Sequence, residues 1–206
     1  MEIDYKAAHR KIQLALEAEA KGQVFFSKEN LSSEFNRGCN HISGLLHSAF
    51  QLYVSESFPT SIFIAITAIE EIAKLKIALY RNESLTAPAK NRKEDHLFSH
   101  KAKHSIALQE VIAVGTRLPN AIGEERVREL LNMAETGELI RVRESSLYIN
   151  SANGKFTTPK DIFTKKEARE ILLLALEAWD DRLVGLTDYT FEIDKELTNI
   201  FDIVSK

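Results

Sequence analysis

The stretch that most restricts the fold is SIFIAITAIEEIAKLK, residues 61–76. Its first nine residues carry no charge, and their apolar side chains would point to nearly every side of a helix. A helix that is apolar all round belongs in a core or an interface. Glu70, Glu71 and Lys74 nevertheless follow in the same stretch. A charge stranded in a dry interior costs on the order of several kcal/mol, so each of these must be paired or used.

The rest of the chain also has the 3.6-residue periodicity of amphipathic helices. Helices are expected over residues 4–21, from 36 or 40 to 55, over 59–81, from the end of an 82–91 connection to 117, and over 123–140, 164–185 and 191–204. A polar loop is expected within residues 28–38. Thr164 and Glu167 form the pattern of a capping box, which predicts where the helix over 164–185 begins.

The one strand-like segment is SSLYINSANGKFTTP, in which two short runs flank Asn153 and Gly154, a favoured pair for a tight turn. No repeat, low-complexity run or domain linker interrupts the sequence. A chain of 206 residues is long enough to bury a substantial core as one domain. The sequence therefore predicts a single all-α bundle over residues 1–206, with one short β-hairpin.

Charge and cysteine content narrow the functional classes. The net charge is −3, so any nucleic-acid binding must come from a local patch. Residues 90–104 hold five Lys or Arg, two acids and three histidines, and form either such a patch or a solvated helix face. No apolar run approaches the roughly 20 residues of a membrane span. Cys39 is the only cysteine, which excludes a cysteine-built zinc site and suits the cytosol. We therefore expect a cytoplasmic protein with no membrane association.

The charges at the end of the 61–76 stretch would share one side of the helix. At about 100° per residue, Lys74 projects between Glu70 and Glu71 and lies at the spacings that let helical side chains meet. One interpretation is a solvent-facing ion pair, worth only tenths of a kcal/mol. The other is a half-buried polar pocket in which a carboxylate acts as a base or orients one, while Lys74 holds an anion. The two interpretations differ in how deeply these three side chains are buried.

His96, His100 and His104 recur every four residues, which would place them above one another on one helix face. The pattern allows a zinc site, a merely exposed polar face, or a phosphate-handling site. In the third case His100 is the acid or base, Lys101 or Lys103 holds the anion, and RNA supplies its own 2′-hydroxyl nucleophile without a metal. Further on, Arg141 and Arg143 precede Glu144 and Tyr148. They either reach the same pocket or make local ion pairs at a helix end.

Three blocks of the sequence resemble a known family. Residues 40–74, NHISGLLHSAFQLYVSESFPTSIFIAITAIEEIAK, resemble the first helical hairpin of AbiV-type abortive infection proteins, which ends in Glu-Glu-x-(Gly or Ala)-Lys. FSHKAK resembles their Phe-x-x-His-x-x-Lys segment in part, since one residue separates Phe98 from His100 and Lys103 follows three positions later. RVRESSLYINSANGKFTTPKDIFTKKEA resembles their closing signature. The resemblance covers residues 36–180.

The AbiV family is placed in the wider HEPN group, whose members are helical bundles that commonly dimerise and often cleave RNA without a metal. The resemblance implies a HEPN-like up-and-down bundle with additional helices, acting as a homodimeric antiphage effector that halts translation. RNA is the implied substrate, a phage-encoded protein the possible activator, and no cofactor or metal is expected. Glu70 or Glu71 would position His100, and Lys74 and Lys103 would stabilise the phosphate. The expected substrate contacts are His96, Lys101, His104, Arg141, Arg143 and Tyr148.

One departure from the HEPN pattern leaves a rival open. The usual nuclease signature is Arg, four to six residues, then His, whereas Arg92 precedes His96 by three intervening residues and His100 by seven. Either the catalytic set is rebuilt around the Glu-Glu-Lys and His-Lys blocks, or the bundle only binds. The rival is a non-catalytic module that blocks translation or senses a phage protein through its surface.

Overall fold

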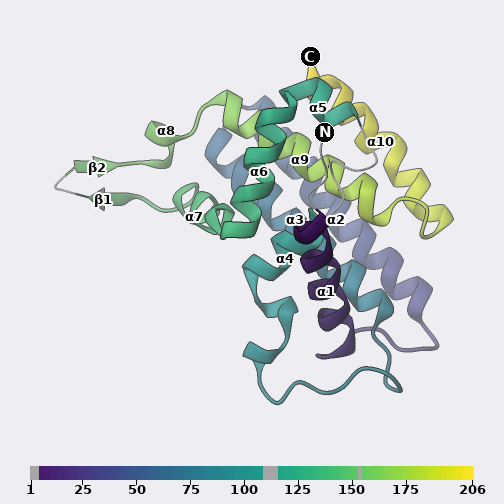
Figure 1. Cartoon of the computed structure of the whole chain (residues 1–206). Coiled ribbons are helices and arrows are strands. Elements are labelled where there is room, and N and C mark those ends of the chain that lie inside the picture. The colour runs from purple at the N-terminus through teal and green to yellow at the C-terminus, as the bar shows by residue number, and fades with distance from the viewer. Residues whose placement is uncertain (1–4, 109–115, 153–154) are drawn as a thin grey trace.

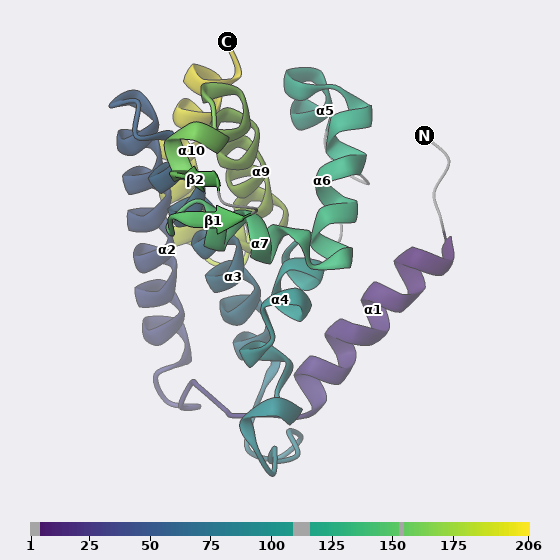
Figure 2. The same cartoon turned by 90° about the vertical axis from the view of Figure 1, so that its left-hand side faces the viewer.

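The core is built around α3 (Phe58–Tyr80), the helix that contains the apolar stretch. A computed structural model describes residues 5–108, 116–152 and 155–206 (Figure 1). α3 contacts α1, α2, α4, α7, α8 and α9, and its isoleucines at 62, 66, 69 and 72 are fully or almost fully buried. Figure 2 shows α3 between α2 on one side and α4 on the other. The prediction that this stretch lies in the core is confirmed, because neighbours on several sides cover its apolar faces.

The elements follow one another in the order that the sequence predicts, with several additions. The helices around α3 are α1 (Tyr5–Ala20), α2 (Leu31–Val54), α4 (His100–Ala107), α5 (Arg117–Ile122), α6 (Glu124–Thr136), α7 (Glu138–Ser145), α8 (Pro159–Ile162), α9 (Lys165–Leu183) and α10 (Asp188–Ser205). The predicted all-α class is confirmed. Among the described residues, none of the helices is both long and apolar enough to cross a membrane.

The largest error concerns the helix expected to continue to residue 117. The chain instead forms two 3-10 turns, η1 (Arg92–Glu94) and η2 (His96–Phe98), before α4 begins. Asp95 interrupts the run because its Oδ1 accepts a hydrogen bond from the Leu97 backbone N–H. Ser99 interrupts it again by accepting one from the Ala102 N–H through Oγ. Short polar side chains that bond to the backbone in this way favour new helix starts. Residues 109–115 lie outside the described part.

Three other boundaries differ from expectation. The helix expected over 123–140 is two helices, because Gly137 takes the left-handed conformation, with φ 86°, that ends α6 and starts α7 in a new direction. α2 begins at Leu31, within the expected polar loop, and the Glu34 carboxylate accepts a hydrogen bond from the Ser27 N–H just before it. α8 was not expected, and a capping box between Thr158 and Asp161 marks its start.

The predicted capping box and hairpin are both present. Thr164 and Glu167 bond reciprocally at the start of α9, whose apolar face includes the fully buried Trp179. Strands β1 (Asn150–Ala152) and β2 (Lys155–Thr157) pair antiparallel and project away from the bundle (Figure 1). The predicted turn residues 153 and 154 lie outside the described part of the chain.

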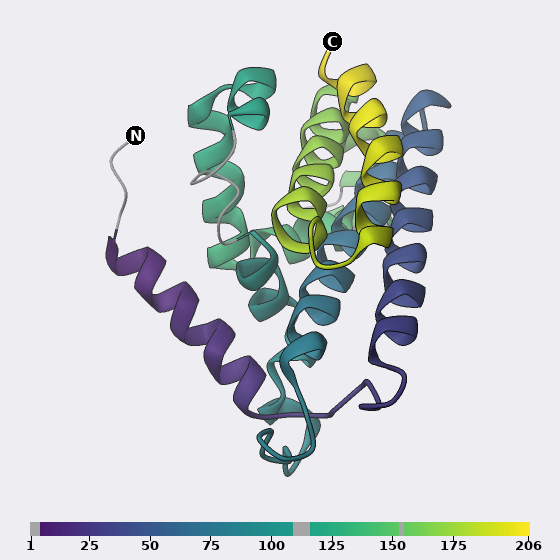
Figure 3. The ribbon, with the colours of Figure 1, turned by 90° about the vertical axis from the view of Figure 1, so that its right-hand side faces the viewer.

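A buried ion pair joins α1 to the rest of the fold. The Arg81 guanidinium donates hydrogen bonds to both carboxylate oxygens of Asp95, at 3.0 and 2.7 Å, and both side chains are buried. It also donates to the backbone carbonyls of Ala18, Lys21 and Gln23, where α1 ends. Beyond this anchor, α1 runs away from the bundle toward the N-terminus (Figure 3). Arg81 therefore stabilises the junction between α1, α3 and η2.

Candidate functional site

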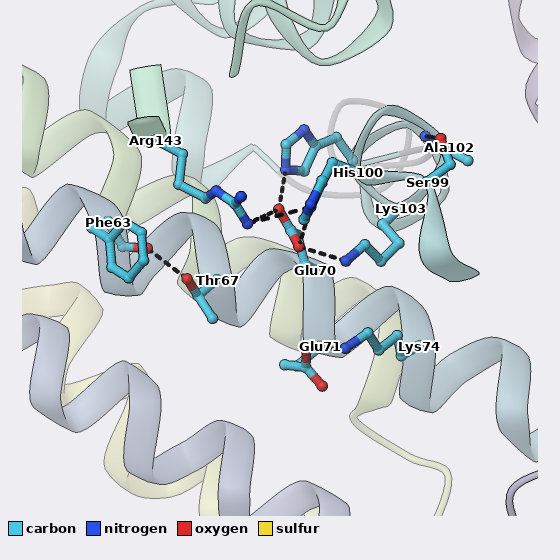
Figure 4. A network of polar contacts seen from close by, with 11 residues as sticks. Phe63, Thr67, Glu70, Glu71, Lys74, Ser99, His100, Ala102, Lys103 and Arg143 are labelled. Atoms are coloured by element: carbon cyan, nitrogen blue, oxygen red, sulfur yellow. Dashed lines mark hydrogen bonds and ion pairs between the residues drawn. The ribbon is translucent and has the colours of Figure 1, made fainter. Parts of the chain in front are cut away.

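One buried carboxylate collects four basic side chains. Glu70, on α3 and 3% exposed, accepts hydrogen bonds at Oε2 from His100 Nδ1 (2.7 Å) and Lys103 Nζ (2.5 Å). Its other oxygen, Oε1, accepts from Arg143 Nη1 (2.9 Å) and His104 Nε2 (3.2 Å). Figure 4 shows Glu70 of α3, His100 and Lys103 of α4 and Arg143 of α7 converging. We call Glu70, His100, Lys103, His104 and Arg143 the Glu70 cluster.

The cluster follows from how two short helices meet α3. On α4, His100, Lys103 and His104 stand at i, i+3 and i+4, the spacings of one helix face, and this face turns toward α3. The break at Gly137 separates α7 from α6, and α7 then lies against α3. Arg143 reaches the cluster from there, with its guanidinium over the Phe63 ring at 5.9 Å from the centroid.

The hydrogen bonds decide the charge of Glu70. Burial by itself would raise the pKa of this carboxyl group, but hydrogen bonds from His104 and Lys103 outweigh it and hold the pKa far below its usual range. Burial lowers the pKa of Lys103, against the opposing pull of Glu70. The cluster thus contains an ionised carboxylate with the basic side chains of Lys103 and Arg143 beside it. An additional anion would be attracted there.

An ionised Glu70 also sets the protonation pattern of both imidazoles. A carboxylate only accepts, so Nδ1 of His100 must carry the hydrogen of the 2.7 Å bond. Arg143 Nη1 lies 3.3 Å from the same nitrogen, and since both atoms carry hydrogen, Glu70 is their shared acceptor. The His100 side chain is 40% exposed, and its Nε2 has no partner among the described residues. His104 is completely buried and donates through Nε2, which leaves its Nδ1 without a partner in the described chain.

Glu71 and Lys74 do not belong to the cluster. They form an ion pair with each other, with side chains 26% and 33% exposed, and Figure 4 shows both directed away from Glu70. They line a separate cavity of about 190 Å³ between α2, α3 and the segment before α2. Each of the two interpretations of Glu70, Glu71 and Lys74 therefore holds for part of the group. Glu70 is buried in a polar pocket, whereas Glu71 and Lys74 form an ion pair near solvent.

The remaining predicted residues are scattered. The prediction that three histidines share one helix face is wrong, because His96 lies in η2. There its Nε2 is 3.7 Å from a Glu17 carboxylate oxygen. Only His100 and His104 share α4. Lys101 and Arg141 are exposed and lie outside the cluster, and Tyr148 is 63% exposed on the approach to β1. Nothing in the sequence pattern pointed to Phe25 and Phe26, which line the 190 Å³ cavity.

The residues with metal-binding geometry lie elsewhere. Among the described residues, Glu177, Asp180 and Asp181 of α9 bring carboxylate oxygens within 4.8 Å of one another. Arg117 already forms ion pairs with Glu177 and Asp180, so its guanidinium occupies the space beside these two carboxylates. The Glu70 cluster has a different donor set, in which both histidines donate a ring N–H to the Glu70 carboxylate.

Comparison with known proteins adds one finding. A family model described as AbiV (HEPN_AbiV) matches residues 39–180, a range that contains the whole Glu70 cluster together with Glu71 and Lys74. Neither the curated proteins nor the solved structures contain a match to this sequence.

Proposed function

The chain belongs to the AbiV family of HEPN-like proteins, and from this premise we propose that it is a metal-independent ribonuclease that shuts down translation in a phage-infected cell. The observation that carries the proposal is the hydrogen bond from His100 to the buried, ionised Glu70. A carboxylate that holds one ring nitrogen of a histidine orients the other nitrogen for proton transfer. Because the His100 side chain is 40% exposed, that other nitrogen is available to a substrate.

The proposed chemistry begins at Nε2 of His100. This nitrogen removes the proton of an RNA 2′-hydroxyl, and the 2′-oxygen attacks the adjacent phosphorus. The bond from phosphorus to the 5′-oxygen breaks, which leaves a 2′,3′-cyclic phosphate on one fragment and a 5′-hydroxyl on the other. The proton passes from the imidazolium to the departing 5′-oxygen, directly or through solvent. Glu70 stabilises the imidazolium between the two transfers.

The two cations of the cluster have different proposed tasks. The Arg143 side chain is 18% exposed and donates from the rim, so we assign it to the phosphate oxygens on which negative charge develops. Lys103 is only 4% exposed and bonded to Glu70. Its task is to keep Glu70 ionised rather than to touch RNA. His104, completely buried on the other carboxylate oxygen, is likewise a positioning residue.

Arg143 also bears on the missing nuclease signature. The HEPN pattern has an arginine a few residues before the histidine on one chain segment. Here an arginine from α7 lies 3.3 Å from the His100 ring although it follows His100 by 43 positions. The proposed catalytic set therefore brings an arginine and a histidine together in space without the usual spacing in sequence.

The other partners belong to the same proposal. A homodimer and a phage-encoded activator both require an exposed surface, and the hairpin region offers the apolar side chains of Tyr148, Ile149 and Phe156, each 63–64% exposed. The same surface favours the rival function, a binding module without catalysis. The proposed site of action is the cytoplasm, where the RNA is.

The direct test incubates the purified protein with total RNA in EDTA. We expect cleavage by the parent protein and a loss of at least about a hundredfold for His100→Ala, the usual contribution of a general acid–base group. The control is His96→Ala, which removes a similarly exposed imidazole outside the cluster. RNA that stays intact with the parent protein, both alone and after addition of lysate from phage-infected cells, would refute the nuclease proposal and favour the binding module.

A further inference from the structure

A strip of partly exposed side chains runs along α3 beside the Glu70 cluster. Phe63, Thr67, Glu71 and Lys74 lie at helical spacings on it, while most of the remaining positions of this part of α3 are buried. Figure 4 shows all four on the part of α3 that carries the cluster. Toward the C-terminal end of the strip opens the cavity of about 190 Å³ that Glu71 and Lys74 line.

The lining of this cavity combines flat apolar surface with charge. Its apolar members are Phe25, Phe26, Ile42, Leu75 and Ala78, and its polar members are His41, Glu71 and Lys74. Pockets for drug-sized ligands start at about 300 Å³, so a hollow of 190 Å³ suits a single ring system. Phe25 leaves 43% of its surface exposed although it is a large aromatic side chain. An exposed aromatic side chain beside a cation is the combination on which splayed-out nucleic-acid bases stack.

We propose that this cavity binds one base of the RNA whose phosphate lies at His100 and Arg143. The inference rests on the proposed function and adds a specificity subsite to it. Phe25 stacks on the base, Lys74 faces the phosphate attached to that nucleotide, and Glu71 accepts a hydrogen bond from an exocyclic amine. Lys74, expected from the sequence to hold the scissile phosphate, therefore acts one nucleotide away.

The closeness of the two sites supports this arrangement. Glu70 and Glu71 are adjacent on α3, one directed into the cluster and the other into the wall of the cavity. Lys74 and Glu71 also interact electrostatically with the ammonium group of Lys103, which is bonded to Glu70. One strand lying along the strip would thus meet the cluster and the cavity with neighbouring nucleotides.

The first experiment measures equilibrium binding of adenosine 5′-monophosphate to the full-length protein. This probe has no internal phosphodiester to cleave, and ribose 5-phosphate is the matched probe that lacks a base. We expect the base to improve affinity about tenfold or more, the effect of stacking one base on an aromatic side chain. Phe25→Ala should abolish that difference. Phe25→Leu, which keeps apolar bulk without an aromatic face, should lose most of it.

Phe191→Ala is the matched control, since Phe191 is a similarly exposed phenylalanine on α10 outside the cavity. It should leave the tenfold difference intact. Equal binding of the two probes, or a difference that survives Phe25→Ala, would overturn the inference.

A second measurement separates this inference from the proposed function. Sequencing the ends of cleaved RNA should show a base preference next to the cut that Phe25→Ala relaxes while cleavage continues. Cleavage with an unchanged preference would overturn the subsite and leave the nuclease standing. Base-dependent binding that Phe25→Ala abolishes, without any RNA cleavage, would overturn the nuclease and leave the cavity standing as a base-binding site.

Discussion

Glu70 and Glu71 are chemically identical neighbours with opposite surroundings. Glu70 is 3% exposed and bonded to four basic groups, whereas Glu71 is paired with Lys74 near solvent. Removing one partner of a buried charge pair costs about 3–5 kcal/mol, because the other charge stays buried without compensation. Exposed pairs contribute about 0–1 kcal/mol. The two residues thus provide a matched pair of sites for substitution.

Glu70→Gln should lower the free energy of unfolding at pH 7 by about 3–5 kcal/mol, because it leaves Lys103 charged and buried without a counter-ion. Glu71→Gln is the control and should change it by less than about 1 kcal/mol. Urea denaturation of the two variants and the parent measures both values. Equal effects of the two substitutions would contradict the burial difference between them.

The difference in free energy of unfolding between the parent and Glu70→Gln should also depend on pH. A carboxyl group whose pKa is depressed by folding contributes stability above its unfolded pKa and loses it as the pH falls through the folded value. Because the pKa of Glu70 is held far below its ordinary value, the difference in free energy of unfolding between the parent and Glu70→Gln should not fall between pH 7 and about pH 5. It should then shrink progressively as the pH falls from about 5 toward the depressed folded value.

At the residue scale, the sequence predicted the members of the Glu70 cluster better than it predicted their contacts. The two sequence blocks Glu-Glu-x-x-Lys and His-x-x-Lys contain Glu70, His100 and Lys103, which the structure brings together. The division between Glu70 and Glu71 was not predictable, because a step of about 100° around a helix decides it only once the neighbouring helices are known.

Among the elements, α1 is held at its C-terminal end by Arg81, a side chain outside it. Arg81 donates to Ala18, Lys21 and Gln23 carbonyl oxygens while it is held by Asp95. Arg81→Lys keeps the charge but cannot reproduce a planar, multi-donor group. We expect amide hydrogen exchange of α1 to become at least tenfold faster, with α9 little changed. Arg128→Lys, at an exposed pair with Glu124, is the control and should leave α1 unaffected.

The start of α9 provides a second prediction at this scale. Thr164 accepts a hydrogen bond from the Lys166 N–H, and Glu167 accepts one from the Thr164 N–H. Thr164→Ala should lower the free energy of unfolding by about 0.5–2 kcal/mol, the usual cost of losing such a cap. Thr136→Ala is the control, since Thr136 is exposed at the end of α6 and its hydroxyl donates to the Asn132 carbonyl of the same helix. Denaturation curves showing equal losses would contradict the capping role.

The elements that the sequence predicted well are those with local signals. α3 follows from an apolar run, and α9 follows from its capping box. The breaks near α4 were missed because Asp95 caps η2 while it is locked by Arg81, 14 positions away in the chain. A break set by a contact of this kind leaves no periodicity to detect.

At the scale of the whole molecule, the bundle assembles one site from three distant segments. Glu70 of α3, His100 of α4 and Arg143 of α7 meet although 30 and 43 positions separate successive members. Neither stripe periodicity nor motif spacing specifies that meeting, because it depends on how α4 and α7 lie against α3. Family membership and the all-α class were accessible from sequence, whereas the sequence left open whether Arg143 reaches the cluster or makes a local ion pair.

The central claim is that His100, held by Glu70, uses the 2′-hydroxyl of RNA without a metal. The most direct measurement compares a short RNA with the same RNA methylated at every 2′-oxygen, both incubated with the protein in EDTA. We expect that only the unmodified RNA is cut and that its new ends are 2′,3′-cyclic phosphate and 5′-hydroxyl. Cutting of the methylated strand, or cutting that occurs only when a divalent metal is restored, would contradict it.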